Sequence, residues 1–358
     1  MEILSSGNVK TLRDIALRRM YSQRLLQSRM TEPQEVVAHM GAMQAQDFGM
    51  SFWAIGSRIQ GSTFAQVEQA YNRGDILRTH ALRPTWQLVT AEDIRWIISL
   101  TRPQILSSIR SRQKELGLTE AVFNKTARIL EMAMKGNHHL TREEIGGLLS
   151  GEGVDLKDNR LSHLLMWAEL EGLICSGPLK RNKITYALFS ERVPKSAPIS
   201  KEEALEKLAK RYFSSRYPAT LADFTWWSGL TARDARKAFE MAKTSADEWE
   251  ATGIPGGCRC VLAAAFDEYV ISYKDRSAII SGEHLKRAIS MNGIFRPVAI
   301  IDGRAAGIWK RTVKKDRIII EATLFQKINK AGLMEIEQAA AWYGAFYGKQ
   351  VEINIQTV

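Results

Sequence analysis

Residues 126–188 contain three helical patterns followed by two short strand patterns, an order that few folds accommodate. The second helix has a strong start signal, because Thr141 and Glu144 stand at capping-box spacing. The third helix, expected from about residue 158, carries leucines at core spacing and ends before Gly172. Two short strands then flank a cationic turn. The segment is therefore predicted to fold as helix, helix, helix and hairpin.

This order is that of a winged helix, in which the third helix enters a DNA groove and the hairpin tip lies against the phosphate backbone. The predicted tip carries Lys180, Arg181 and Lys183, which we expect to bind DNA. A generic small α+β unit is the alternative interpretation.

The helix triplet recurs in the second half of the chain. Residues 201–242 again contain three helical patterns, and strand patterns follow over residues 259–324. A stretch with two prolines, residues 193–200, is a candidate linker between the two triplets. A last helix, residues 333–347, is expected to close the chain. With 358 residues, two or three domains are expected.

The net charge of +11 and the pI near 9.5 favour a polyanionic partner, nucleic acid before membrane, although a merely basic soluble protein remains the alternative. Cys175, Cys258 and Cys260 are an odd number without a disulfide framework, and we expect reduced thiols. The first ten residues lack a signal-peptide pattern, and no membrane span is present. These features predict a cytoplasmic protein. The sequence also contains no metal-binding or cofactor motif.

Two glutamines, Gln44 and Gln46, stand one residue apart where a helical pattern ends. On a helix they would point to different faces, whereas on an extended segment they share one face. Gly41 before them and Asp47 after them are residue types that end helices and allow turns. The local sequence therefore permits both amides to face one cleft, although the motif alone is weak. Asp47 suits a helix-end role better than chemistry.

Two further segments have the exposure expected of functional surfaces. Residues 77–89 are rich in strand formers but broken by Pro84, which predicts an edge strand or a strand–turn–strand, and His80 is the only histidine there considered for a site. A second predicted hairpin is either a solvated turn or a phosphate-binding element. Its cations are Lys310, Arg311, Lys314, Lys315 and Arg317.

Five motifs follow one another in a recognisable order. They are Gln44-Ala45-Gln46; Arg78-Thr79-His80 with Arg83-Pro84-Thr85-Trp86; Asp223-Phe224 with Trp227-Ser228-Gly229-Leu230; Ala265-Phe266-Asp267-Glu268-Tyr269 with Arg276; and Gly303 with Gly307-Ile308-Trp309-Lys310-Arg311. Together they resemble the tandem winged-helix DNA glycosylases of the AlkZ type, over nearly the whole chain.

The resemblance implies an α+β, mainly helical fold of three tandem winged-helix units in a C shape around DNA. The units would be residues 1–120 with the glutamine pair, residues 121–193, and residues 200–358 with C-terminal β-hairpins. It also implies that Gln44 and Gln46 are catalytic and that a basic hairpin probes the duplex. The other substrate-site candidates are Asp47, His80, Arg83, Thr85, Trp86 and Gln87. Similar proteins commonly carry a histidine where this chain has Gln87.

The implied activity is that of a monofunctional DNA N-glycosylase acting on alkylated purines and, in some members, on interstrand crosslinks. Two amides suit this chemistry, because an alkylated purine is already cationic and leaves without strong acid catalysis. No cofactor or metal is expected, and the partner would be alkylated double-stranded DNA. The competing prediction is a non-catalytic winged-helix protein such as a transcriptional regulator. A regulator would normally bind DNA as a dimer, whereas three units in one chain favour a monomeric enzyme.

Overall fold

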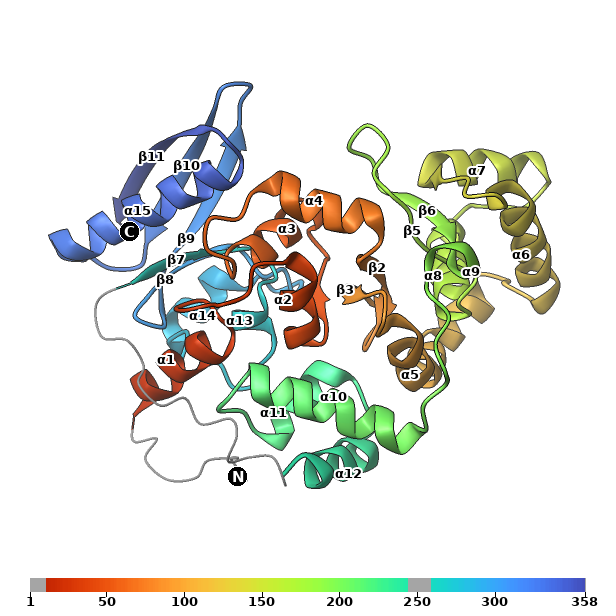
Figure 1. The fold of residues 1–358 in the computed structure, drawn as a ribbon, viewed down its shortest axis with the longest axis horizontal. Helices are drawn as coiled ribbons and strands as arrows, with labels where there is room; N and C mark the ends of the chain where they lie inside the picture. Colours follow the sequence, from red (N-terminus) through yellow and green to blue (C-terminus); the bar gives the residue numbers. More distant parts are fainter. Residues whose placement is uncertain (1–10, 244–258, 358) are drawn as a thin grey trace.

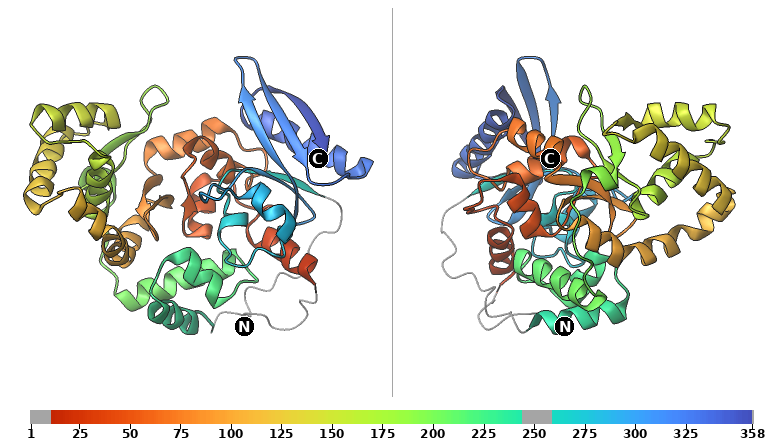
Figure 2. Two further views of the ribbon diagram at one scale, coloured as in Figure 1. Left: turned by 180° about the vertical axis from the view of Figure 1, so that it is seen from behind. Right: turned by 45° about the vertical axis from the view of Figure 1, so that its right-hand side comes forward.

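The computed structural model describes residues 11–243 and 259–357, and its fold is α+β with more helix than strand (Figure 1). The first ten residues, the segment 244–258 with Cys258, and Val358 lie outside the described residues. The described chain forms a central body with helices α6 to α8 at one side and the β9–β10 hairpin at the other (Figures 1 and 2).

The N-terminal part surrounds a small antiparallel sheet of order β1-β3-β2. The predicted strand–turn–strand around Pro84 is confirmed, because β2 and β3 pair on either side of it. The elements are α1 (Leu12–Ser22), α2 (Pro33–Met40), β1 (Met43–Gln44), α3 (Phe48–Gly56), α4 (Phe64–Arg73), β2 (Ile76–Ala81), β3 (Thr85–Thr90) and α5 (Ile94–Glu115).

The middle part confirms the order helix, helix, helix and hairpin. Thr141 and Glu144 form the predicted capping box, and the strands make a sheet of order β4-β6-β5 around a hydrophobic core of their own. The elements are α6 (Glu120–Met134), β4 (Leu140–Thr141), α7 (Arg142–Gly151), α8 (Arg160–Leu170), β5 (Ile174–Ser176), β6 (Thr185–Leu188) and α9 (Phe189–Arg192).

The C-terminal part joins three helices to a sheet of order β11-β10-β9-β8-β7. The prediction that a helix closes the chain is wrong, because β11 follows α15 and pairs with β10 in parallel. The elements are α10 (Lys201–Ser215), α11 (Leu221–Ser228), α12 (Ala232–Ala242), β7 (Cys260–Ala263), α13 (Glu268–Ile271), α14 (Gly282–Ala288), β8 (Val298–Ile301), β9 (Arg304–Val313), β10 (Arg317–Leu324), α15 (Lys330–Phe346) and β11 (Gln350–Thr357).

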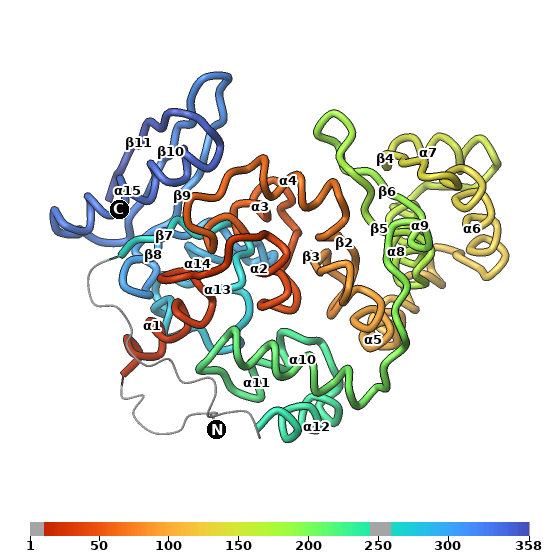
Figure 3. Tube along the Cα trace, in the orientation of Figure 1, coloured from red at the N-terminus to blue at the C-terminus, as the bar shows by residue number. Residues whose placement is uncertain are grey.

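Two large hydrophobic cores combine residues from both ends of the chain. One contains Leu77 with Tyr212 and Trp227, and the other contains Trp53 with Tyr343. The path of the chain in Figure 3 brings α1 and α2 beside α13, where the Tyr269 hydroxyl donates to the carbonyl of Ala16. The region around the glutamine pair is therefore built from segments that are far apart in sequence.

Lowering the pH should destabilise the fold through His39, on the helix that leads to the glutamine pair. Burial lowers the pKa of His39 to about 4, although its hydrogen bond to the Ser22 carbonyl opposes the shift. Since the unfolded chain takes up this proton below about pH 6.5, it binds more protons than the folded chain between pH 6.5 and 4. Stability is therefore lost as the pH falls through that window, by up to about 3 kcal/mol from this group.

The check is urea unfolding measured from pH 7 to pH 4.5. His39→Gln should flatten the curve, and the exposed His138→Gln should leave it unchanged. If the free energy of unfolding depended on pH equally in wild type and His39→Gln, the pH effect could not be assigned to His39.

Candidate active site

Strand β1 carries Gln44, and Gln46 lies in the bend between β1 and α3. Helix α2 ends at Gly41 with a φ of 73°. Gln44 then pairs with Gln87 of β3, and the amide of Ala45 donates to the Trp86 carbonyl at 2.8 Å. Pairing with β3 continues to Ala45, so Gln46 lies just beyond the paired residues and a common face for the two amides stays a prediction. Gln46 is exposed, and Gln44 is 6% exposed.

A row of polar side chains crosses one face of the sheet. Gln44, Gln87 and Thr79 are neighbours in register on β1, β3 and β2, and all three are buried. Gln87 Nε2 donates to Thr85 Oγ1 at 3.0 Å. Gln44 Oε1, Gln87 Oε1 and Thr79 Oγ1 accept no hydrogen bond from the residues that the structure describes. Unpartnered buried acceptors are costly, about 1–3 kcal/mol each, and several together are typical of a functional site.

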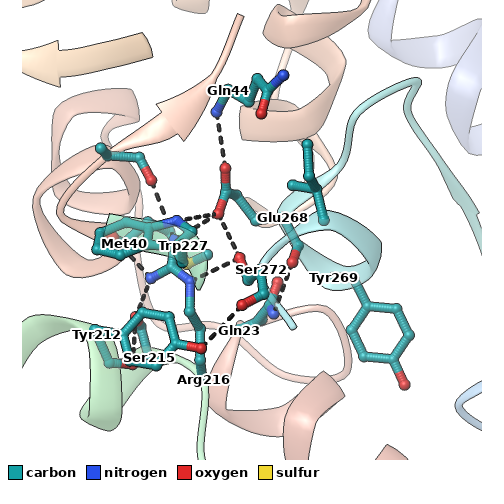
Figure 4. A network of polar contacts seen from close by, with 12 residues as sticks. Gln23, Met40, Gln44, Tyr212, Ser215, Arg216, Trp227, Glu268, Tyr269 and Ser272 are labelled. Atoms are coloured by element: carbon teal, nitrogen blue, oxygen red, sulfur yellow. Dashed lines mark hydrogen bonds and ion pairs between the residues drawn. The ribbon is translucent and has the colours of Figure 1, made fainter. Parts of the chain in front are cut away.

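The buried carboxylate of Glu268 binds the backbone of this row at Gln44. Glu268 Oε1 accepts from the amide of Gln44 at 2.8 Å, while the side chain of Gln44 extends away from it (Figure 4). Its other oxygen accepts from Arg216 Nη2 at 2.7 Å and from Trp227 Nε1 at 3.0 Å, and from the Ser272 hydroxyl. Glu268 is 1% exposed and its charge is paired with that of Arg216.

Arg216 fixes the segment that leads into the pair. Its Nη1 donates to the Met40 carbonyl at 2.8 Å and its Nη2 to the Ala42 carbonyl at 3.1 Å. The guanidinium lies over the Trp227 ring, 4.4 Å from its centroid. The carbonyls of residues 40 and 42 and the amide of residue 44 are thus held by one buried ion pair. This arrangement restricts the backbone that carries Gln44 and Gln46.

A second buried ion pair stands directly beside the first. Asp267 receives two hydrogen bonds from Arg58, at 2.8 and 3.1 Å, and Arg58 also donates to Gln23. Both residues are about 1% exposed. Asp267 and Glu268 therefore anchor α3 and β1 through adjacent positions of one short segment.

Two predicted site residues lie on the opposite face of the sheet. His80 and Trp86 are partners in register there, with ring centroids 4.6 Å apart. His80 is buried and its Nδ1 bonds to Glu169 of α8, while the Arg78 guanidinium lies 4.1 Å from the Trp86 ring centroid. The prediction that His80 and Trp86 line the site with the glutamines is corrected, because strand alternation directs them away from Gln44 and Gln87.

The remaining site candidates are Asp47, Thr85 and Arg83, and each has a different position relative to the two glutamines. Asp47 is the N-cap of α3, and its carboxylate accepts from the amide of Met50 at 3.1 Å, which confirms a helix-end role. Thr85 contacts Gln87 as described. Arg83 lies in the β2–β3 turn, with its guanidinium 5.1 Å from the ring centroid of Trp226.

Both predicted cationic hairpins project from the same side of the molecule, in every view (Figures 1 and 2). At the β5–β6 tip, Lys180 and Lys183 pair with Glu144 and Glu143 of α7, and Arg181 is exposed. At the β9–β10 tip, Lys314 and Lys315 are exposed, and the ammonium of Lys349 adds a further cation by donating to both of their carbonyls.

The other cations of the second hairpin have partners in the fold. Lys310 pairs with Glu321, and Arg317 with Asp316 and Glu352. Arg311 bonds to Tyr343 and Tyr347 and donates to the Gly49 carbonyl at 2.8 Å. Arg311 therefore anchors the hairpin beside the start of α3, three residues after Gln46.

Comparison with known proteins identifies the family. A model of the DNA glycosylase AlkZ-like family matches residues 37–346, which is most of the chain. The chain belongs to the AlkZ-like DNA glycosylase family. The match includes the glutamine pair, the Glu268 network and the second basic hairpin. Family membership supports a DNA glycosylase, and the transcriptional regulator is not favoured.

One sequence relative and one solved structure, both from Streptomyces sahachiroi, are similar to this AlkZ-like chain. An interstrand DNA cross-link repair glycosylase of Streptomyces sahachiroi is 24% identical over 286 residues, covering 73% of this chain and 69% of that protein. The solved structure of the Streptomyces sahachiroi DNA glycosylase AlkZ superposes with a TM-score of 0.78 at 21% identity, covering 97% of this chain and 99% of that one. The second comparison supports the fold.

Two classes of site or segment are absent from this AlkZ-like chain within residues 11–243 and 259–357. No cluster of three or more histidine, cysteine, aspartate or glutamate side chains is arranged to bind a metal ion. No helix there is both long and apolar enough to span a membrane.

Sequence reasoning missed the supporting network of this AlkZ-like site. Arg216 and Glu268 are separated by 52 residues, and Glu268 and Gln44 by 224. The one signal was the motif around Asp267 and Glu268, which carried the family resemblance without a role for either carboxylate.

Proposed function

We propose that this chain hydrolyses the N-glycosidic bond of alkylated, cationic purines in double-stranded DNA, with Gln44 and Gln46 at the reacting centre. The observation that carries the proposal is the buried row Gln44, Gln87 and Thr79, whose three side-chain oxygens have no partner among the described residues, with the exposed Gln46 two residues after Gln44. Such acceptors can bind a water and turn its oxygen toward a reacting carbon.

When the base is cationic, the protein does not need to supply strong acid catalysis for its departure. The bond between the sugar C1′ and the base breaks, and its electron pair neutralises the charge of the leaving purine. A water oxygen bonds to C1′, and the water proton passes to solvent. The carbonyls of Gln44 and Gln46 orient that water and stabilise positive charge on the sugar through their dipoles.

The same chemistry predicts selectivity against normal bases, whose departure needs a proton donor or a free carboxylate. Glu268 is engaged by four donors and charge-paired with Arg216. Asp47 caps a helix. Neither carboxylate therefore serves as the acid for a neutral leaving group.

We infer further that residues 1–120, 121–193 and 200–358 act as three tandem winged-helix units arranged in a C shape around the duplex. One chain would act per lesion, without cofactor or metal, on chromosomal DNA in the cytoplasm. The Streptomyces relative is an interstrand DNA cross-link repair glycosylase, which supports interstrand crosslinks as a second substrate class.

The test is incubation of the protein with a duplex that contains one 7-methylguanine, followed by alkali cleavage of the abasic product. A strand break at the lesion, and none in an undamaged duplex of the same sequence, is expected. A damaged duplex left intact by excess protein that nevertheless binds it would overturn the proposal.

Replacing Gln87 by histidine should make the excision rate depend on pH. Gln87 is the cross-strand neighbour of Gln44 and has no titratable group, so the wild-type rate should be nearly constant between pH 6 and 8. The ordinary pKa of an imidazole, about 6.5, lies within that range. Single-turnover rates across the range measure the effect, with His138→Gln as the surface control. An excision rate that does not change with pH in Gln87→His would show that residue 87 does not act on the reacting centre.

A further inference from the structure

Two arginines and a tryptophan from three separate segments meet at the end of the β2–β3 hairpin. The guanidinium groups of Arg83 and Arg276 lie 5.1 and 5.4 Å from the ring centroid of Trp226. Trp226 belongs to α11, donates from Nε1 to the Ile271 carbonyl at 3.2 Å and is 39% exposed. Its neighbour Trp227 is buried in the Glu268 network. Trp226 is therefore the member of the pair that reaches solvent.

The two positive charges have no bonded counter-charge. Neither Arg83 nor Arg276 forms an ion pair within 4.0 Å with any described residue, and Arg83 Nε and Arg276 Nη2 are buried without an acceptor. Arg276 uses its other nitrogens on the carbonyls of Val270 and Lys274. Burial lowers the pKa of both groups, and the charge of Arg83 lowers that of Arg276 further, while Glu268 raises the pKa of Arg83 and Asp223 and Asp275 raise that of Arg276. Two guanidinium groups that repel each other over one ring would gain from a shared anion.

The cluster borders the glutamine face. The amide of Thr85 donates to the Arg83 carbonyl at 2.6 Å, and the Thr85 hydroxyl accepts from Gln87, the cross-strand partner of Gln44. Glu268, which holds the amide of Gln44, is also close enough to act on the charge of Arg83. An anion bound by Arg83 would thus lie beside the reacting centre.

We propose that Arg83 and Arg276 bind one backbone phosphate of the damaged DNA strand, next to the nucleotide whose base is removed, with Trp226 as their support. The proposal rests on the proposed function for the identity of the ligand. Guanidinium groups match phosphate oxygens with paired hydrogen bonds, and the indole holds both groups in place by cation–π contact. The site is distinct from the two projecting hairpins, because its residues come from the β2–β3 turn, α11 and the segment after α13.

The experiment is the salt dependence of binding to a duplex with a stable abasic analogue, followed by fluorescence anisotropy. Neutralising one phosphate contributes about 0.9 to the slope of log K against log salt. Arg83→Met with Arg276→Met should lower that slope by about one unit and weaken binding about tenfold at 0.15 M salt. Each single variant should show most of this loss, because the two groups share one phosphate. Arg83→Lys should keep the slope, since it keeps the charge.

The matched control is Arg13→Met, which removes an exposed arginine on α1 whose nearest carboxylate, Asp302, is 3.7 Å away. It should leave slope and affinity unchanged. Arg83→Met loses no hydrogen bond to a described residue, so it should fold, and a melting curve checks this. If the double variant kept the wild-type slope of log K against log salt, the phosphate site would be overturned. Excision by the wild-type protein would show that the proposed function still stands. Absence of excision by the wild type would instead overturn the proposed function, and the binding slopes would still decide the phosphate site.

Discussion

Replacing Gln46 by alanine should lower the rate of 7-methylguanine release at least about 100-fold, while affinity for the duplex stays within a few-fold. Gln46 is exposed and lies two residues after Gln44, which pairs with Gln87. Its amide would be used in the transition state and contributes little to binding of the phosphate backbone. Loss of a preorganised dipole at the reacting centre therefore lowers the rate of the chemical step. Single-turnover excision and anisotropy titration measure the two quantities separately.

The matched control for Gln46→Ala is Gln69→Ala, an exposed glutamine on α4. Both variants remove the same side chain from the surface, so stability should change little in either. Equal loss of excision and of duplex affinity in Gln46→Ala would assign the residue to binding. Unchanged excision would remove it from the reaction.

Replacing Glu268 by glutamine should destabilise the folded protein by about 3–5 kcal/mol. The substitution keeps the shape of the side chain but leaves the guanidinium of Arg216 buried, at 0% exposure, without its counter-charge. Chemical unfolding of wild type and variant measures the loss. Glu240→Gln is the control, because Glu240 is exposed and its pairing with Lys243 on the surface of α12 should contribute less than about 1 kcal/mol.

The same variant tests whether the network positions the glutamines. At a temperature where Glu268→Gln remains folded, its excision rate should fall about tenfold or more while duplex affinity is retained, because the amide of Gln44 loses a charged acceptor. The double variant Glu268→Gln with Arg216→Met removes both charges and should recover part of the stability. A stability loss as small as that of Glu240→Gln would contradict the role of the buried pair.

Much of the secondary structure followed from short-range signals. The capping box at Thr141 and Glu144, the proline at the first position of α2 and the break at Pro84 each depend on residues within one turn or hairpin. Strand β11 had such a signal too. Its apolar residues Val351, Ile353 and Ile355 alternate with polar ones, which is typical of a strand and contradicts the prediction that a helix closes the chain.

The position of the two glutamines between helices also followed from local chemistry, because Gly41 is the C-cap of α2 and Asp47 is the N-cap of α3. The faces of the β2–β3 hairpin did not follow. His80 and Trp86 have the polarity of site residues, yet the register of β3 with β1 puts Gln87 beside Gln44 and turns His80 toward Glu169. A shift of one residue in pairing would have exchanged the two sets.

Local patterns in the chain thus specify its helices, its hairpins and the spacing of its two amides, since each of these depends on neighbours a few residues away. The buried network that holds the backbone of residues 40–44 was decided by the tertiary structure alone. Glu268, Arg216 and Trp227 carry charge or bulk that would suit a surface as well as a core. Only long-range packing buries them together and directs their hydrogen bonds to the backbone of residues 40–44.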